Sequence, residues 1–581
     1  MEEAAGSEPI HEDLDDIARR IAERSGAVRL AGLRGGAGAV VGAKLVAQLG
    51  DAPALFVAPT AKACDALAQD LCAALGEPAE GGRVRAFPAH DTHPYERFSP
   101  QPFLVAQRMD VLYRWLASAQ PDARVEPAPI AVAPWTALAL RVPSREVVRS
   151  RSVHLEVGQI TDRDALVATL VGAGYSRMSL VEERGELAVR GGILDIFPPH
   201  RAHPIRIELL GDEVESIREF DEATQRSRDS LSHVVAPPPR ELLLNRSLVV
   251  DRSERIRELA VEQGVSNRAV DELLDSLLRG HIPPGTEALA PLLQPSVETI
   301  FDYLPSDTLI VVVDPEAGRD RMQRYVSDAT ENYAVARESG RVVSEPDELA
   351  LSPEALEREV FARKPVFLER LDVVDLEAEG EHLSLRCSGH DSLRGELVKA
   401  RSSDQALEPL VDALANWCDE GWRTALCISA LSSAERLRHL LSEYGLEVRI
   451  AENPRPASRW SSPGRVEIRV CDFSEGFVFP AERLVVLTEE AIFGPRQRRR
   501  VRAHWPDGAS IEGLAQREKG DYLVHAEHGI GVYRGLVELD LGIARGEFLR
   551  LEYHDGDRLF VPVHRLSLIP RSGGSDGPAP R

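Results

Sequence analysis

The sequence has few features of a secreted, membrane-spanning or metal-binding protein. No apolar run approaches the roughly 20 residues that span a bilayer, and the acidic N-terminus lacks the basic region and apolar core of a secretory signal. The six cysteines are scattered without a CxxC pair, which argues against a disulfide framework or a zinc site. These absences predict a cytoplasmic protein with no membrane partner and no bound metal.

Aromatic residues and net positive charge are also scarce. Aromatic residues make up 5% of the chain, which does not favour a broad base-stacking platform for single strands. The 69 basic residues face 93 acidic ones, so a net charge of −24 repels phosphate overall. Contact with DNA is therefore expected to be local or indirect. The arginines at 496, 498, 499, 500 and 502 could touch DNA phosphates, but such a run more often forms a solvated linker or a clamp onto an acidic surface.

The composition, 43% hydrophobic and 28% charged over 581 residues, is typical of a globular protein with several domains. Strand, glycine turn and helix alternate in the first part, as in a parallel sheet with crossover helices. Short strands of alternating polarity follow, then a second α/β region and a last group of short strands of Tudor or SH3-like size. The predicted segments are 1–144 (α/β), 145–220 (inserted α+β), 221–348 (mixed α/β), 360–495 (small α/β), 496–515 (basic linker), 516–571 (β-barrel) and 572–581 (linker).

A glycine loop lies between the first strand and the next helix, where a nucleotide-binding P-loop would stand. Its glycines are Gly32, Gly35, Gly36 and Gly38. A P-loop needs Lys to reach the β- and γ-phosphates and Ser or Thr to hold Mg²⁺. Gly38 and Ala39 fill those two positions here. The pattern predicts a degenerate loop that makes a strand-to-helix turn, with residual anion binding as the open alternative. We expect no cofactor in this chain.

Two histidine pairs, His90 with His93 and His525 with His528, could suggest metal binding. Neither pair has the i, i+4 helical spacing of a zinc-binding H-E-x-x-H motif, and both lie beside turn residues. A structural or hydrogen-bonding role is the favoured interpretation.

Three segments carry a resemblance to known families. They are FPAHDTHPYERFSP (87–100), VEERGELAVRGGILDIFP (181–198) with its continuation at 211–221, and GDYLVHAEHGIGVY (520–533) with its continuation to 562. Residues 80–320 resemble the UvrB-homology module, and residues 516–570 resemble the CarD-type domain that interacts with RNA polymerase. The two in this order resemble the bacterial transcription-repair coupling factors, the Mfd family.

The resemblance implies a multidomain α/β protein. Its parts would be a degenerate P-loop (RecA-like) module of UvrB type with an inserted α+β domain, a second small α/β domain and a C-terminal Tudor/SH3-like β-barrel. It implies a scaffold for transcription-coupled nucleotide excision repair, which binds RNA polymerase stalled at DNA lesions through the β subunit and recruits UvrA. The full-length family is an ATP-dependent DNA translocase that uses ATP and Mg²⁺. Its motor would follow the polymerase-interacting domain, and this sequence stops at Arg581, so we expect no enzyme activity from this chain.

Two other functions remain open at this stage. A UvrB-like, nucleotide-dependent damage-binding subunit would need the missing P-loop lysine. It would also need a long hairpin after Tyr95, for which residues 96–102 are too few. A stand-alone CarD-like transcription regulator would leave residues 1–515 without a role.

The resemblance also suggests binding residues. For UvrA these are Arg177, Arg190 and Phe197. The alternative is that Arg190 pairs with Glu183 or Glu186 on a solvated hairpin, and that Phe197 is a core residue. The segment 516–571 carries eight basic and nine acidic residues, which favours a protein partner over duplex DNA. The predicted polymerase-binding edge is Arg534, Gly535, Leu536, Val537, Glu538 and Leu539. Leu539 would be its apolar anchor unless it belongs to the barrel's own core.

Overall fold

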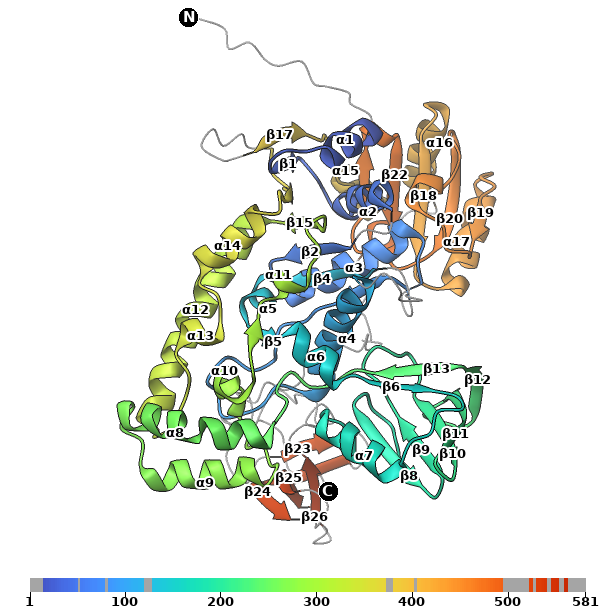
Figure 1. Cartoon of the computed structure of the whole chain (residues 1–581). Helices are drawn as coiled ribbons and strands as arrows, with labels where there is room; N and C mark the ends of the chain where they lie inside the picture. The colour runs from blue at the N-terminus through green and yellow to red at the C-terminus, as the bar shows by residue number, and fades with distance from the viewer. Residues whose placement is uncertain are drawn as a thin grey trace, which may run out of the picture. The chain divides into compact units, whose positions relative to one another are not determined.

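The chain forms two compact units, residues 1–496 and 497–581, in a computed structural model (Figure 1). The units are described separately below. The structure describes residues 14–50, 53–78, 82–119, 128–372, 380–401, 405–494, 522–525, 529–540, 545–552 and 558–562. None of the helices within these ranges is both long enough and apolar enough to cross a membrane.

A seven-stranded parallel sheet organises the first unit, in the order β17-β1-β16-β15-β2-β4-β3. Alternate residues of its central strands point into two separate cores: Phe56 lies on one face and Leu55 on the other. The strands are β1 (Val28–Ala31), β2 (Ala54–Ala58), β3 (Val84–Ala86), β4 (Ile130–Pro134), β15 (Leu309–Val313), β16 (Val366–Leu368) and β17 (Glu381–Ser384).

The two faces of this sheet are covered by different helices. The cluster containing Phe56 includes residues of α1 (Leu14–Ala22), α2 (Ala37–Leu49) and α3 (Ala61–Leu75). The cluster containing Leu55 includes residues of α4 (Pro102–Ser118), α5 (Trp135–Ala139), α11 (Ile300–Tyr303), α12 (Pro315–Glu338) and α14 (Pro353–Phe361). Both faces are buried, which explains why the strands are continuously apolar.

The first sheet is built from several of the predicted segments. Segments 1–144 and 221–348 both contribute strands to it, because β15 pairs directly with β2. The predicted segment 360–495 divides between two sheets, because β16 and β17 both pair with β1 of the first sheet. Pairing between strands far apart in sequence leaves no local signal, so the periodicity alone could not reveal it.

A six-stranded sheet, β12-β11-β10-β9-β8-β7, is inserted between β5 (Val142–Pro143) and β14 (Val297–Glu298). Its neighbours pair antiparallel except β7 and β8. The strands are β7 (Ser176–Arg177), β8 (Glu186–Arg190), β9 (Ile193–Ile196), β10 (Ile205–Leu210), β11 (Glu213–Phe220) and β12 (Ser227–Leu231). The helix α7 (Arg163–Gly172) contributes Leu166 and Leu170 to the core of this sheet.

A two-stranded ladder, β6 (Val153–Glu156) with β13 (His233–Ala236), adds to the same core. The inserted region therefore extends well past residue 220, where the sequence placed its end.

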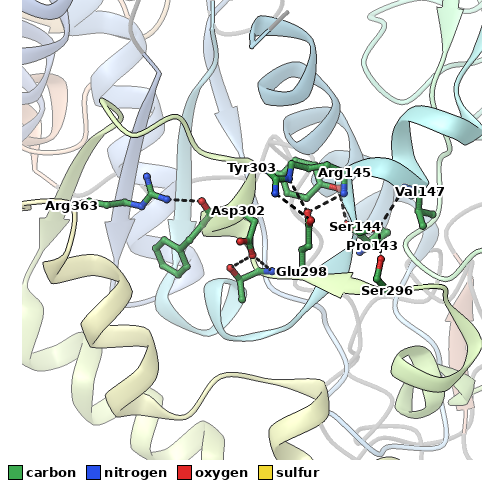
Figure 2. Close-up of polar contacts among 11 residues, drawn as sticks. Pro143, Ser144, Arg145, Val147, Ser296, Glu298, Asp302, Tyr303 and Arg363 are labelled. Carbon is green, nitrogen blue, oxygen red and sulfur yellow. Dashed lines mark hydrogen bonds and ion pairs between the residues drawn. The ribbon is translucent and has the colours of Figure 1, made fainter.

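Polar contacts stabilise the point where the chain passes from the first sheet to this insertion (Figure 2). We call this group of contacts, made by residues 143–145, 296, 298 and 303, the joint. The Tyr303 hydroxyl donates to the carbonyl of Pro143 at 2.6 Å, and the Ser296 hydroxyl donates to Ser144 at 2.9 Å. Ser144 also caps α6 (Arg145–Arg151), and the Arg145 guanidinium pairs with Glu298 at 3.0 Å. These contacts tie β5 and the start of α6 to β14 and α11.

The rest of the first unit is a helical group and a second sheet. The helical group comprises α8 (Arg246–Glu262), α9 (Asn267–Leu278), η1 (Thr286–Leu289), α10 (Ala290–Leu293) and α13 (Pro346–Leu349). The second sheet has the order β19-β20-β18-β22-β21, with β18 (Arg423–Ile428), β19 (Arg449–Ala451), β20 (Arg465–Val470), β21 (Phe477–Phe479) and β22 (Leu484–Thr488). Its helices are α15 (Asp391–Ala400), α16 (Glu408–Asp419), α17 (Leu431–Glu443) and α18 (Glu489–Phe493).

The second unit contains an antiparallel sheet in the order β23-β24-β25-β26. The strands are β23 (Tyr522–His525), β24 (Gly529–Asp540), β25 (Arg545–Glu552) and β26 (Arg558–Pro562). Closure of these strands into a barrel stays a prediction. The arginines at 496–502, His528 and the tail at 572–581 lie outside the described residues.

Candidate partner-binding surfaces

The six-stranded sheet has an apolar face and a second face that carries charged side chains beside a small apolar cluster. The strand registers place Leu187, Leu194 and Ile207 on the face that packs in the core with α7. On the other face, Asp195 of β9 stands opposite Arg206 of β10. Arg206 in turn stands opposite Arg218 of β11. We call Arg190, Asp195, Arg206 and Arg218 the polar sheet face.

Asp195 is the centre of this face although it is only 1% exposed. Arg206 donates to both of its carboxylate oxygens, and Arg190 donates from Nη2 to Oδ2 at 3.2 Å. The hydrogen bonds that Arg206 donates to Asp195 raise the pKa of Arg206. The Arg206 guanidinium also lies 4.5 Å from the centre of the Phe220 ring. One buried carboxylate therefore orients two arginines.

A turn between β11 and β12 completes the cluster. Gln225 has a positive φ of 58°, and its side-chain oxygen accepts from Arg190 at 3.3 Å and from Arg206 at 3.4 Å. Its side-chain nitrogen donates to the carbonyl of Glu222 at 2.8 Å. Both the oxygen and the nitrogen of the Gln225 amide are hydrogen-bonded. The amide therefore also restricts the orientation of the Arg190 and Arg206 guanidinium groups.

Arg190 is the sequence-predicted residue that the structure places on this face. Its side chain is 48% exposed. The contacts to Asp195 and Gln225 replace the pairing with Glu183 or Glu186 considered from the sequence. Glu186 instead accepts the backbone N–H groups of residues 182 and 183. Two contacts thus orient the Arg190 guanidinium, and the side chain remains half-exposed.

Neither Arg177 nor Phe197 joins Arg190 on an exposed surface. Arg177 is exposed on the edge strand β7, and its register with Leu187 places it on the opposite face from Arg190. Phe197 is 5% exposed and packs with Val181, Ala188 and Phe220. Its part in binding a partner stays a prediction, and its position in the structure is that of a core residue.

The sequence reasoning missed Asp195, Arg206 and Gln225. A signal for the first two was present, because both occupy polar positions in strands of alternating polarity. Asp195 follows Leu194, and Arg206 lies between Ile205 and Ile207. The role of Gln225 depends on a turn that brings it back over β8 and β10, and no short motif encodes that.

The predicted polymerase-binding edge lies in β24. Residues 529–532 of this strand pair with β23, and residues 536–540 pair with β25. A break in register falls between Tyr533 and Leu536, where Gly535 has a φ of 100°. Within the residues that the structure describes, no strand pairs with the other side of residues 536–540. The backbone there has the form of an open edge.

The side chains of this edge are described only in part. Tyr533 is 6% exposed, and Arg534 donates from Nε to Glu552 at 2.6 Å. Arg534 therefore pairs across the sheet with β25. The side chains of Leu536, Val537, Glu538 and Leu539 lie outside the described residues, so the role of Leu539 as an anchor stays a prediction.

The two histidines at 90 and 93 take part in structural contacts. His90 pairs with Glu241 at 2.8 Å, and the fully buried Arg108 donates to the same carboxylate at 2.6 Å. Burial alone would raise the pKa of Glu241, but the charges and hydrogen bonds of Arg108 and His90 lower it to about 2. His93 stacks near Tyr325, with ring centres 5.4 Å apart.

The glycine loop meets the second sheet of the same unit. The N–H of Gly36, the first residue before α2, donates to the carbonyl of Glu475 at 3.0 Å. Gly32 has a φ of 79°, and a Cβ there would lie 2.5 Å from the carbonyl oxygen of Leu385. The tight turn and the close approach of neighbouring backbone both require glycine.

Two family models match this chain. The UvrB interaction domain matches residues 153–242, and the CarD-like/TRCF RID domain matches residues 518–572. The first range contains the polar sheet face, and the second contains β23 to β26.

The chain is also similar along most of its length to transcription-repair-coupling factors. It is 31% identical to that of Myxococcus xanthus over 98% of this chain and 47% of the relative. It is 25% identical to the Bacillus subtilis protein over 95% of this chain and 46% of the relative. It is 29% identical to the Escherichia coli protein over 84% of this chain and 41% of the relative. The chain spans about half the length of the curated relatives it matches.

Proposed function

We propose that this chain belongs to the transcription-repair-coupling factor family and is the protein-binding part of such a factor. In this role it links RNA polymerase stalled at a DNA lesion to UvrA, and so to nucleotide excision repair. The observation that supports this most directly is the presence of both matched domains, at 153–242 and 518–572, in one chain. A bridge between two partners needs two binding surfaces on one molecule.

The polar sheet face is the surface we assign to UvrA. Arginine is frequent among residues that dominate the energy of protein interfaces, because its planar guanidinium forms paired hydrogen bonds and stacks on flat groups. Asp195 and Gln225 already restrict Arg190, so a partner would pay little entropy to order it. Its half-exposed end remains available to an acidic or carbonyl-rich surface.

The open edge of β24 is the surface we assign to RNA polymerase, through its β subunit. An unpaired strand edge offers free N–H and C=O groups to a partner strand, and nearby side-chain pockets can fix the register. The register break at Tyr533 to Leu536 separates this edge from the half of β24 that pairs with β23. We propose that residues 536–539 of the predicted edge are the part that pairs with the partner strand.

We further propose that ATP-dependent DNA translocation resides in the part of the full-length relatives that this chain does not match. ATP and Mg²⁺ would then act in that part, and DNA would reach this chain indirectly. We also propose that the protein works in the cytoplasm, where the polymerase is found.

A sequential capture experiment tests the proposed bridge. The full 581-residue chain is immobilised, loaded with purified polymerase, washed and then exposed to purified UvrA without nucleotide. The proposal expects both proteins to be retained together. Retention of polymerase without UvrA would favour the stand-alone CarD-like regulator. The experiment is then repeated with ATP, and retention of UvrA alone, in the ATP experiment only, would favour the UvrB-like damage-binding subunit.

A further inference from the structure

The loop between β20 and β21 occupies the position where a P-loop would hold phosphate. In a nucleotide-binding loop, backbone N–H groups at the start of the helix point at the phosphates. Here the N–H of Gly36, at the start of α2, donates to the carbonyl of Glu475 at 3.0 Å. A peptide carbonyl of the same chain therefore accepts from an N–H group that would point at a phosphate in a P-loop.

The space above the glycine loop is filled as well. A Cβ at Gly36 would lie 2.1 Å from the ring of Phe473, and one at Gly35 would lie 2.6 Å from the carbonyl oxygen of Gly476. The Phe473 ring is 9% exposed and packs at 5.7 Å from Trp460 and at 6.1 Å from Phe477. Residues 473–476, which we call the covering loop, thus fit closely over the glycines. Phosphate and the covering loop cannot occupy this place together.

Asp70 of α3 holds the covering loop from the side. This carboxyl is 3% exposed. Its Oδ1 accepts from the backbone N–H of Ser474 at 2.6 Å, and its Oδ2 shares a short hydrogen bond with the Ser474 hydroxyl. The titratable groups that face it are Glu475 on the covering loop and Cys427 on β18. Both carry no charge or a negative one, so neither of them can compensate a carboxylate.

The second sheet packs on the same side. Ala425, Cys427 and Val486 belong to the core cluster that contains Val40 of α2 and Leu71 of α3. The covering loop therefore extends this apolar contact through Phe473 and adds the polar contacts of Ser474 and Glu475 at its border.

We propose that the glycine loop has become a docking site for the covering loop, and that a proton shared between Asp70 and Ser474 controls how firmly the two are joined. The occupant is a segment of this chain, residues 473–476, and its chemistry matches the site: a carbonyl for the Gly36 N–H, and a hydroxyl and an N–H for the carboxyl. Gly35 and Gly36 suit this site because a side chain at either position would collide with the covering loop.

The direction of the pH effect follows from burial. Burial raises the pKa of Asp70 from its usual 3.8 to about 7, with Glu475 adding to the rise and the hydrogen bonds from Ser474 opposing it. The docked state therefore binds the proton more tightly than the open state does. The stabilisation is complete below about pH 4 and is lost as the pH rises through about 7. A protonated carboxyl keeps both contacts, because Oδ2 can donate to the Ser474 hydroxyl while Oδ1 still accepts.

Hydrogen exchange on the full chain tests the proposal. Peptides covering residues 34–42 and 471–477 are followed by mass spectrometry at pH 6 and pH 8, with exposure times scaled for the intrinsic pH dependence of exchange. With pKa values of about 7 docked and about 4 open, local opening should rise about tenfold between these pH values. In Asp70→Asn, which keeps one acceptor and one donor without a charge, this rise should vanish.

Two further variants make the result decisive. Asp472→Asn makes the same chemical change at an exposed position beside the covering loop, and it should behave as the parent chain does. Asp70→Ala removes the acceptor of the Ser474 N–H, and it should raise opening at pH 6 as well. The proposal is overturned if Asp70→Asn keeps the tenfold rise, if the parent chain shows none, or if Asp70→Ala protects both peptides as well as the parent does.

Discussion

Arg206 donates two parallel hydrogen bonds to Asp195, from Nε to Oδ1 at 2.8 Å and from Nη2 to Oδ2 at 2.9 Å. Such two-point pairing fixes the plane of the guanidinium as well as its position. Because the carboxylate is almost fully buried, the pair also organises the sheet around it. Arg190, the residue expected to meet UvrA, makes its ion pair with the same carboxylate.

Asp195→Ala should destabilise the region of the six-stranded sheet, residues 153–242, before it affects any other part of the chain. We call these residues the interaction region. The change leaves Arg206, whose side chain is 15% exposed, without its main partner, and a cost of about 2 kcal/mol is expected. Hydrogen exchange in β9 and β10 at neutral pH measures this local stability. Asp221→Ala is a suitable control, because it removes a more exposed carboxylate that pairs with Arg228. Equal protection in Asp195→Ala and the parent chain would contradict the assigned role of Asp195.

Arg190→Ala should weaken UvrA binding by about 1–3 kcal/mol, which is roughly a 5- to 150-fold increase in Kd. The variant should stay folded, because the guanidinium is half-exposed and Arg206 still satisfies Asp195. Calorimetry or surface-bound titration with purified UvrA measures the change. The matched control is Arg268→Ala, which removes an arginine that is 87% exposed and pairs with Glu272 on α9. Unchanged UvrA affinity in a folded Arg190→Ala would remove this residue from the interface.

Local patterns predicted local structure well in this chain. The continuous apolar run Ala54–Ala58 became a strand buried on both faces, and Ile205–Leu210 became a strand with alternating burial. Both follow from the two-residue period of a strand, which depends only on neighbours in sequence. The glycine loop likewise stands between a strand and a helix, as its pattern indicates.

Contacts between residues far apart in sequence could not be predicted. The pairing of Val28 with Val366, and of Asp70 with Ser474, joins residues separated by more than 300 positions. For the candidate site, Arg190 was suggested by the family resemblance of its hairpin segment, and its part in binding a partner stays a prediction. Asp195 was missed because one buried carboxylate among strands looks, in sequence, like any other polar position.

The full chain should not release phosphate from ATP above the blank in a steady-state assay. Gly38 and Ala39 stand where Lys and Ser or Thr would act, and the Gly36 N–H already donates to Glu475. Added ATP and Mg²⁺ should also leave hydrogen exchange at residues 34–42 unchanged. Phosphate release that disappears when Gly38 is replaced by Phe would locate hydrolysis at this loop and contradict the prediction.

Tyr303→Phe should destabilise the joint between the first sheet and the interaction region by about 1 kcal/mol. The change removes only the hydroxyl that donates to the Pro143 carbonyl at 2.6 Å, in a side chain that is almost fully buried. The Pro143 carbonyl oxygen then lacks the hydrogen bond from residue 303. Chemical denaturation followed by hydrogen exchange at residues 142–151 measures the effect. Tyr333→Phe, which removes a more exposed hydroxyl bonded to Glu345, serves as the control and should change that segment little.

Leu539→Arg should reduce capture of RNA polymerase by the full chain while the second unit stays folded. In β24 the backbone of residue 539 pairs with Gly546 on one side, so a partner strand would have to approach from the other. An apolar side chain at this edge would be covered in such a complex, and burying a charge there without a partner costs several kcal/mol. The matched control is Glu547→Arg, which introduces the same side chain on β25. This strand pairs with β24 on one side and with β26 on the other. Polymerase retained on immobilised chain measures the effect, and circular dichroism checks that each variant is folded. If Leu539→Arg retains as much polymerase as the parent chain, or if Glu547→Arg loses as much as Leu539→Arg, then β24 does not dock through this edge.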